Sequence, residues 1–315
     1  MIVSKAWDHT LKAACVLLLN LAISVTGLRG QDLDPRAYFW VPTGTNSVVA
    51  GFSFLDGSVL TDPTLPIQNI KITAQTPSVG LVHAFGLLGK TSQILVAAPY
   101  TWAQVNGDVN GQHEERERSG FGDLRLRWSV LLVGAPATSL EAFKSVKQKT
   151  IIGISLNIQT PTGQYYPDKL VNIGTHRWSV RPELALSQPL GQRWLVDVYA
   201  GLWLFTDNND FYPGDLVREQ DPLGAFQAHL SYNIKPRLWV ALNTTYYAGG
   251  QTTIDDTYND DRQSNSRVGL TGVLPIGKRS SIKLAVSTGA VVRIGQDYTN
   301  VSIGYQTSWF SRSKE

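Results

Sequence analysis

The sequence predicts an all-β protein, a single antiparallel transmembrane β-barrel of about twelve strands, and three observations support this prediction. An export signal opens the chain, and no apolar stretch long enough for a membrane helix follows it. Apolar and polar residues then alternate with a period of two, which is the period of a strand. Short turns alternate with long polar loops, as they do in barrels of the bacterial outer membrane.

Residues 1–30 have the features of a cleaved secretory signal peptide. Lys5 and Lys12 flank the start of an apolar run of about 13 residues, whereas a spanning helix needs ~20. The single cysteine, Cys15, lies in this run, so the exported chain has no thiol for disulfides or metal binding. Residues 31–44 form an N-terminal segment that either enters the barrel as a plug or leads to it through the periplasm.

The net charge and the spacing of acidic residues argue against nucleic-acid binding and metal binding. The formal net charge is only +3, which gives no strongly basic surface for nucleic acid. Aspartates in the loops, such as Asp255 and Asp256, follow the spacing of no compact calcium loop, so we expect no metal site and no cofactor. Trp is abundant, with nine residues, and this side chain is favoured at boundaries between lipid and water.

The period of two defines the predicted strands. In the segment Ile151 to Thr160, for example, Ile152, Ile154 and Ile158 share one face, while polar residues take the other. Pro77 breaks the alternation of the second strand and suggests a bulge or an irregular entry of that strand. The predicted strands are 45–55, 69–85, 92–102, 121–133, 150–160, 177–188, 194–205, 223–234, 237–248, 266–275, 280–293 and 299–309.

The connections place the two ends of the barrel. The predicted short turns are 87–90, 189–193, 234–237 and 276–279. The predicted long loops are 55–66, 103–118, 161–176, 206–221 and 249–265. Short periplasmic turns and long extracellular loops favour a membrane barrel over a soluble β-sandwich, although both show alternating strands. One connection, Gly134 to Lys149, is long on the periplasmic side, and Ser139 could cap a short helix within it.

The last predicted strand, Asn300 to Phe310, is amphipathic and ends in aromatic residues. Such a strand marks a barrel for the barrel assembly machinery, so Tyr305 and Trp309 are candidates for the membrane-insertion signal. The barrel therefore spans 45–310, with a tail at 311–315, and we expect it in the outer membrane of a Gram-negative bacterium, in contact with its lipid.

Five segments of the chain match a known family in order and spacing: 119–127, 161–187, 205–215, 219–232 and 246–271. They resemble the family called "putative MetA-pathway of phenol degradation", a group of outer-membrane proteins often described as transporters. The resemblance covers nearly the whole exported chain and implies an outer-membrane barrel with a transport role. It carries over no catalytic residues. The tail after Phe310 departs from the usual ending at the aromatic residue.

Charged and aromatic residues on the polar faces are the candidates for the lumen and its constriction. They are Asp123, Arg125, Arg127, Arg177, Arg181, Glu183, Asp197, Tyr199, Trp203, Lys283 and Arg293. One interpretation is a constriction that attracts anionic or aromatic solutes through charge and cation–π contacts. The other is a network of ion pairs that satisfies itself and stiffens the barrel.

These features predict a channel for the passive uptake of small, hydrophobic or aromatic solutes, with no enzymatic activity. The alternative is a barrel that conducts nothing and acts as a structural or surface-binding protein. A remote alternative is a lipid hydrolase, because His229 and Ser231 share the face of one strand. That face points into the lumen, where no phospholipid tail would reach it, which argues against hydrolysis.

Overall fold

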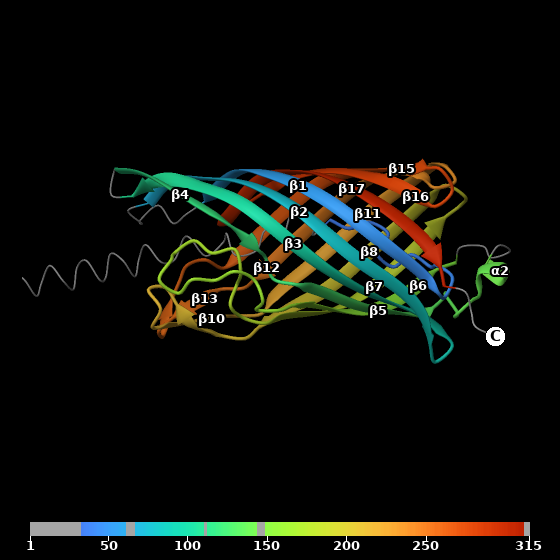
Figure 1. Ribbon diagram of the computed structural model, residues 1–315, viewed down its shortest axis with the longest axis horizontal. Coiled ribbons are helices and arrows are strands. Elements are labelled where there is room, and N and C mark those ends of the chain that lie inside the picture. Colours follow the sequence, from blue (N-terminus) through green and yellow to red (C-terminus); the bar gives the residue numbers. More distant parts are fainter. Residues whose placement is uncertain (1–32, 61–66, 110–111, 144–148, 312–315) are drawn as a thin grey trace, which may run out of the picture.

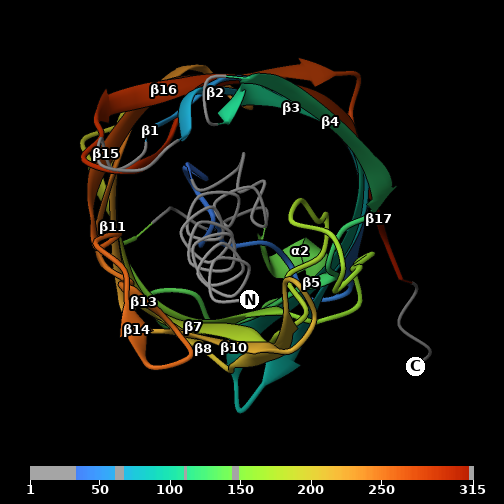
Figure 2. The same cartoon turned by 90° about the vertical axis from the view of Figure 1, so that its left-hand side faces the viewer.

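The computed structural model describes residues 33–60, 67–109, 112–143 and 149–311, which form a β-barrel (Figure 1). The predicted signal peptide and residues 312–315 of the tail lie outside the described residues. Seen along its axis in Figure 2, the barrel is a ring of strands around a central lumen. We call the end with the short turns the turn end and the opposite end the loop end.

Twelve strand positions close the ring, and all neighbours are antiparallel. Both β4 and β5 pair with β3 and share one position around the barrel, while β1 pairs with β17 and closes it. The predicted twelve-stranded barrel is thereby confirmed. Its strands are β1 (Thr45–Leu60), β2 (Ile67–Leu87), β3 (Lys90–Val109), β4 (Gln112–Phe121), β5 (Arg125–Val133), β6 (Ile151–Gln159), β7 (Ser179–Leu190), β8 (Trp194–Phe205), β11 (Leu223–Lys235), β12 (Leu238–Gly249), β15 (Gln263–Ile276), β16 (Ser280–Val291) and β17 (Gly295–Phe310).

The bulge expected at Pro77 is absent, whereas the entry of the strand is irregular, which is the alternative predicted from the sequence. The register of β2 is the same on both sides of Pro77, against β1 and against β3. A proline removes one donor from a ladder, and the intact pairs around it are enough to hold the register. The register shifts instead between Gln68 and Lys71, where Asn69 has a φ of 55°.

Several predicted loops contain strands, which corrects their expected irregular structure. The segment 103–118 is mostly strand, because β3 extends beyond the barrel and pairs with β4, for example at Val105 and Arg116. The loops 206–221 and 249–265 contribute a separate small sheet at the loop end (Figure 1). This sheet consists of β9 (Asn208–Phe211), β10 (Leu216–Gln220), β13 (Thr252–Ile254) and β14 (Thr257–Tyr258).

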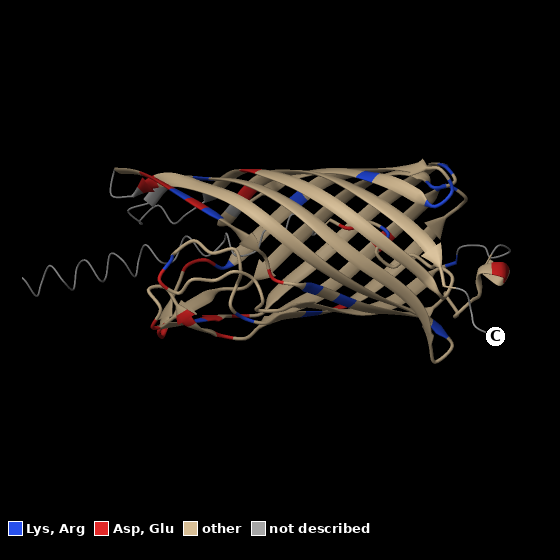
Figure 3. Ribbon diagram, in the orientation of Figure 1, with Lys and Arg blue, Asp and Glu red and all other residues tan. Residues whose placement is uncertain are grey.

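The outer face of the barrel is apolar, as a lipid-facing surface must be. Leu184, Leu242 and Leu270 are each more than half exposed on this face. A charge there would cost about 2–4 kcal/mol at the bilayer midplane, so alternation keeps charges on the inner face. Figure 3 shows most charged residues near the two ends of the barrel. In the described part of the chain, no helix combines the length and apolar character needed to cross a membrane.

The long connection at the turn end carries the predicted helix. Helix α2 (Leu140–Phe143) begins after Ser139, whose Oγ accepts a hydrogen bond from the Ala142 amide at 3.4 Å, so the predicted cap is confirmed. The connection also bonds to the N-terminal segment, because the Thr43 amide donates to the Thr138 carbonyl at 2.9 Å. The extra length of this connection therefore serves to hold the chain that precedes β1.

Candidate functional site: the lumen and the segment within it

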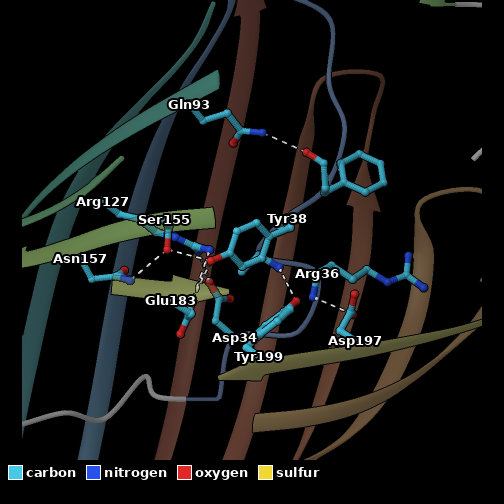
Figure 4. A network of polar contacts seen from close by, with 12 residues as sticks. Asp34, Arg36, Tyr38, Gln93, Arg127, Ser155, Asn157, Glu183, Asp197 and Tyr199 are labelled. Carbon is cyan, nitrogen blue, oxygen red and sulfur yellow. Dashed lines mark hydrogen bonds and ion pairs between the residues drawn. The ribbon is translucent and has the colours of Figure 1, made fainter. Parts of the chain in front are cut away.

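The N-terminal segment, residues 33–44, turns into the lumen from the turn end, and its side chains contact the barrel wall there. Figure 4 shows its side chains among residues of the barrel wall. The segment has no regular ladder with the wall, and the contacts of Asp34, Arg36 and Tyr38 each involve a side chain. The barrel supplies these contacts from β5, β6, β7, β8, β11, β12 and β16.

Tyr38 is the central anchor of the segment, and it is 1% exposed. Its hydroxyl donates to Glu183 Oε1 at 2.9 Å and forms a hydrogen bond of 2.7 Å with Ser155 Oγ. Its ring lies 5.1 Å from the ring of Tyr199, whose hydroxyl accepts a bond from the Ala37 amide at 3.2 Å. Burial raises the pKa of Tyr38 to about 12, so the phenol stays protonated and remains a donor.

Two charged residues of the segment pair with the wall. Asp34 accepts a hydrogen bond from Lys283 Nζ at 2.5 Å and lies 4.0 Å from Arg127 Nη1. Burial raises the pKa of Asp34, but Lys283 and then Arg127 lower it further than burial raises it, so the net shift is downward. Arg36 donates through Nη2 to Asn233 Oδ1 at 2.8 Å and through its amide to Asp197 Oδ2 at 3.2 Å.

A buried carboxylate on the wall links these contacts to two arginines. Glu183 Oε2 lies 3.2 Å from Arg181 Nη2, and Glu183 Oε1 lies 3.8 Å from Arg127 Nη2. The guanidinium of Arg127 also stacks on the ring of Tyr38, 4.5 Å from its centroid. A buried carboxylate is tolerated only when it is paired and hydrogen-bonded, and here the arginines pair with Glu183 while Tyr38 donates a hydrogen bond to its Oε1.

The turn-end connection holds the remainder of the segment. Trp40 donates through Nε1 to the Pro136 carbonyl at 3.1 Å, and its ring meets Phe143 of α2 edge-on at 5.2 Å. On the opposite side, the Gln93 amide nitrogen donates to the Phe39 carbonyl at 2.9 Å. The segment is thus fixed at its base by backbone and aromatic contacts, and at its tip by ion pairs.

The structure brings most of the predicted lumen residues together around the segment. Arg127, Arg181, Glu183, Asp197, Tyr199 and Lys283 contact it or contact one another. Trp203 lies next to Arg181, whose guanidinium is 4.8 Å from the Trp203 ring. Arg125 and Arg177 lie nearer the loop end. Arg125 is the first residue of β5, and Arg177 comes two residues before β7.

Two predicted residues have other positions. Asp123 lies between β4 and β5 and accepts bonds from Thr175 Oγ1 at 2.6 Å, Gln159 Nε2 at 2.8 Å and the Gly163 amide at 2.8 Å. It therefore anchors the loop that follows β6. Arg293 lies beyond the end of β16 and bonds Asp260 Oδ1 at 2.8 Å, at the loop end, so it does not join the central group.

Several residues of the lumen were not among those predicted from the sequence. Arg267 of β15 is 7% exposed, and its guanidinium stacks 3.9 Å from the centroid of Tyr298. The period of two on β15 could have identified it, because its neighbour Val268 faces outward. Arg36 and Tyr38 carry no such signal, since their segment has no periodicity.

His229 and Ser231 do lie on the inner wall, both almost fully buried. His229 Nδ1 forms a hydrogen bond of 2.9 Å with Asn243 Oδ1, and Asn243 Nδ2 donates to Thr271 Oγ1 at 2.9 Å. Within the described chain, no hydrogen bond joins His229 to Ser231. The histidine therefore belongs to a hydrogen-bonded chain with Asn243 and Thr271, across β11, β12 and β15. The pairing of histidine and serine that a hydrolase needs is not formed.

Comparisons with known proteins agree with this architecture. The family model described as "Putative MetA-pathway of phenol degradation" matches residues 42–311. The COG4313 outer membrane channel from Pseudomonas putida F1 is 22% identical, with a TM-score of 0.74 over 88% of this chain and 99% of that chain. The P. putida toluene transporter TodX is 10% identical, with a TM-score of 0.42 over 86% of this chain and 92% of that chain. The first likeness shows the fold, and the second is too distant to add to it. No curated protein matches the chain.

Proposed function

This chain belongs to the family described as "Putative MetA-pathway of phenol degradation", and we propose that it is a passive outer-membrane channel for small hydrophobic or aromatic solutes. The observation that carries the proposal is the way the N-terminal segment fills the lumen. Its tip is held by side-chain contacts of Asp34, Arg36 and Tyr38 and by no strand pairing. It can therefore move while every strand of the barrel stays paired.

The inner wall beyond the segment suits an aromatic solute. Trp203, Leu223, Ala225 and Tyr247 form one buried apolar cluster on β8, β11 and β12, facing the lumen. An aromatic ring placed there would exchange water for apolar and π contacts. Polar residues border this cluster, so the pathway is amphipathic and differs from a wide aqueous pore.

Single-channel recording in planar bilayers tests the proposal. We expect the protein to conduct weakly, and a variant that lacks residues 33–41 to conduct several-fold more, because the deletion empties the lumen and spares the barrel. Cells whose outer membrane contains the protein should take up radiolabelled toluene faster than cells with an empty vector. Absence of conductance from both proteins, together with unchanged toluene uptake, would contradict the channel.

A second candidate function is a barrel that conducts nothing and serves the membrane structurally. The network of Glu183, Arg127, Arg181 and Tyr38 favours it, because these buried groups contact one another and tie the segment to the wall. The recordings above distinguish the two functions. A segment that never leaves the lumen gives no conductance in the complete protein, while the deletion variant still conducts.

We also propose that the final strand directs insertion of the barrel into the outer membrane. Tyr305 and Trp309 lie on the outer face of β17, 44% and 42% exposed. Recognition of this strand by the barrel assembly machinery would place the chain in the outer membrane with its loops outside the cell. The outward direction of both aromatic side chains supports this role.

A further inference from the structure

Three neighbouring residues of the inner wall form a polar row that extends across the lumen face of β11, β12 and β15. Gln227 lies opposite Thr245, and Thr245 lies opposite Arg267, so the three side chains are cross-strand neighbours. All three are more than nine-tenths buried, with exposures of 5%, 1% and 7%. The lumen thus contains a short, continuous line of hydrogen-bonding groups.

This polar row has unused hydrogen-bonding capacity. Gln227 Oε1, Thr245 Oγ1 and Arg267 Nη1 have no hydrogen-bond partner among the residues that the structure describes. The other terminal nitrogen of Arg267 is engaged, because Nη2 donates to the Tyr298 carbonyl at 3.0 Å and to Ser287 Oγ at 3.4 Å. Buried polar groups almost always find partners, so these three adjacent atoms on one face are available to a ligand in the lumen.

The charge at the polar row is positive and not balanced by the wall. Arg267 forms no ion pair with any described carboxylate, whereas Glu183 already serves Arg127 and Arg181. Asp123 is engaged by the loop after β6. A guanidinium with a free edge and a neighbouring hydroxyl matches a carboxylate, which accepts hydrogen bonds from both.

Aromatic side chains lie immediately beside the polar row. Tyr247 is two residues from Thr245 on the same face of β12, and it shares an apolar cluster with Trp203. The Trp203 ring is stacked with Phe205, 6.4 Å away and inclined by 14°. A flat apolar group bound next to Arg267 would therefore meet aromatic surfaces.

We propose that the polar row and the adjacent aromatic cluster form a binding site for a small aromatic carboxylate. This inference rests on the proposed function and specifies its solute class. The carboxylate accepts hydrogen bonds from Arg267 and Thr245, and the Gln227 side-chain amide can turn to donate to it. The ring of the solute packs against Tyr247 and Trp203. A neutral aromatic solute fits the same aromatic surface but leaves the polar row unsatisfied.

Binding measured by calorimetry on the folded, detergent-solubilised protein tests the site. The probes are benzoate, benzyl alcohol and benzylamine, which share a ring and differ in charge. We expect benzoate to bind at least about 10-fold more tightly than benzyl alcohol, because a hydrogen bond to a charged group is worth that factor. Benzylamine should bind most weakly, since Arg267 repels it.

The variants Arg267→Gln and Thr245→Val should each weaken benzoate binding about 10-fold and weaken benzyl alcohol binding less, because a hydrogen bond to the uncharged hydroxyl is weaker. Arg293→Gln is the matched control, because Arg293 is an arginine at the loop end that already pairs with Asp260. Arg267→Lys keeps the charge but loses the planar fork, and it should give an intermediate affinity. Heat-modifiable gel mobility verifies that each variant is folded.

Equal affinities for benzoate and benzyl alcohol, or an equal loss in Arg293→Gln, would overturn the inference. Its failure can be distinguished from failure of the proposed function. If the protein transports toluene without binding benzoate preferentially, the channel stands and the carboxylate site is wrong. If no solute crosses at all but benzoate binds through Arg267, the site is real in a barrel that does not conduct.

Discussion

Tyr38 can lie against the wall of the barrel only because residue 153 is a glycine. A Cβ built on Gly153 would lie 2.6 Å from Cδ1 of Tyr38, inside van der Waals contact. We therefore expect Gly153→Ala to displace the Tyr38 ring and weaken docking of the segment by about 1–3 kcal/mol. Single-channel recording should show a larger open fraction. Gly272→Ala is the control, since a Cβ there meets no atom within 4 Å and the variant should behave as the original protein.

The ion pair of Asp34 makes docking of the segment sensitive to acid. The pKa of Asp34 in the folded protein is below its usual value of 3.8, because Lys283 and Arg127 together outweigh the effect of burial. A depressed pKa contributes stability above the unfolded value, and this contribution is lost as the pH falls through the folded value. The wall carboxylates Asp197 and Glu183 also contact the segment, through the Arg36 amide and the Tyr38 hydroxyl.

We expect conductance to be constant from pH 7 to about pH 4 and to rise below pH 3.8, where Asp34 begins to gain a proton. Asp34→Asn should conduct more at pH 7 and lose most of this rise. The free energy of docking lost in this variant should be small, about 1 kcal/mol or less, because both side chains of the Asp34–Lys283 pair are more than a third exposed. An Asp34→Asn channel with the original conductance at pH 7 would contradict the role of the pair.

Sequence could predict which residues face the lumen but not how they pair. Arg127, Arg181 and Glu183 followed from the period of two, because lipid on the outer face forces charges inward. Their partners Tyr38 and Asp34 belong to a segment without periodicity. The hydroxyl of Tyr38 meets Glu183 across 145 positions of the chain, and no local pattern encodes such a contact.

Among the elements, the connection with α2 acts as a clamp on the N-terminal segment. The ring of Phe143 meets that of Trp40 edge-on at 5.2 Å. We expect Phe143→Ala to remove about 1 kcal/mol from docking of the segment, which is the usual worth of such an aromatic pair. Limited proteolysis should then cut the segment several-fold faster. Leu140→Ala alters the same helix at a side chain that is 38% exposed, and it should leave the rate of cleavage unchanged.

The strand extensions and the small added sheet could not be predicted, because their sequences do not alternate between apolar and polar residues. In the segment 103–118, every residue from Gln112 to Arg118 is polar, because this part of β4 pairs with the extension of β3 beyond the membrane and neither of its faces meets lipid. Alternation, the signal that identified the other strands, is therefore lost. The same holds for β9, β10, β13 and β14, whose strands are too short to show a period.

For the whole molecule, closure depends on the final strand. β17 pairs with β16 on one side and with β1 on the other, so the ring is incomplete without it. We expect Trp309→Ala to lower the amount of folded protein in the outer membrane several-fold, as judged by heat-modifiable mobility of membrane fractions. Trp128→Ala is the matched control, because Trp128 is an outward-facing tryptophan of similar exposure, 46% against 42%. Equal losses from both variants would point to general lipid anchoring.

The position of Leu33 has a practical consequence for anyone who handles the protein. Its side chain lies near Gly269 on the inner wall, since a Cβ on that glycine would lie 2.9 Å from Leu33 Cδ1. An affinity tag joined directly ahead of Leu33 would begin inside the lumen of the barrel, where it would compete for space with the N-terminal segment. Ser311, by contrast, follows the last strand at the turn end, and its amide donates to the Gly44 carbonyl at 2.9 Å. Purification handles and fluorescent labels therefore belong at the carboxyl terminus.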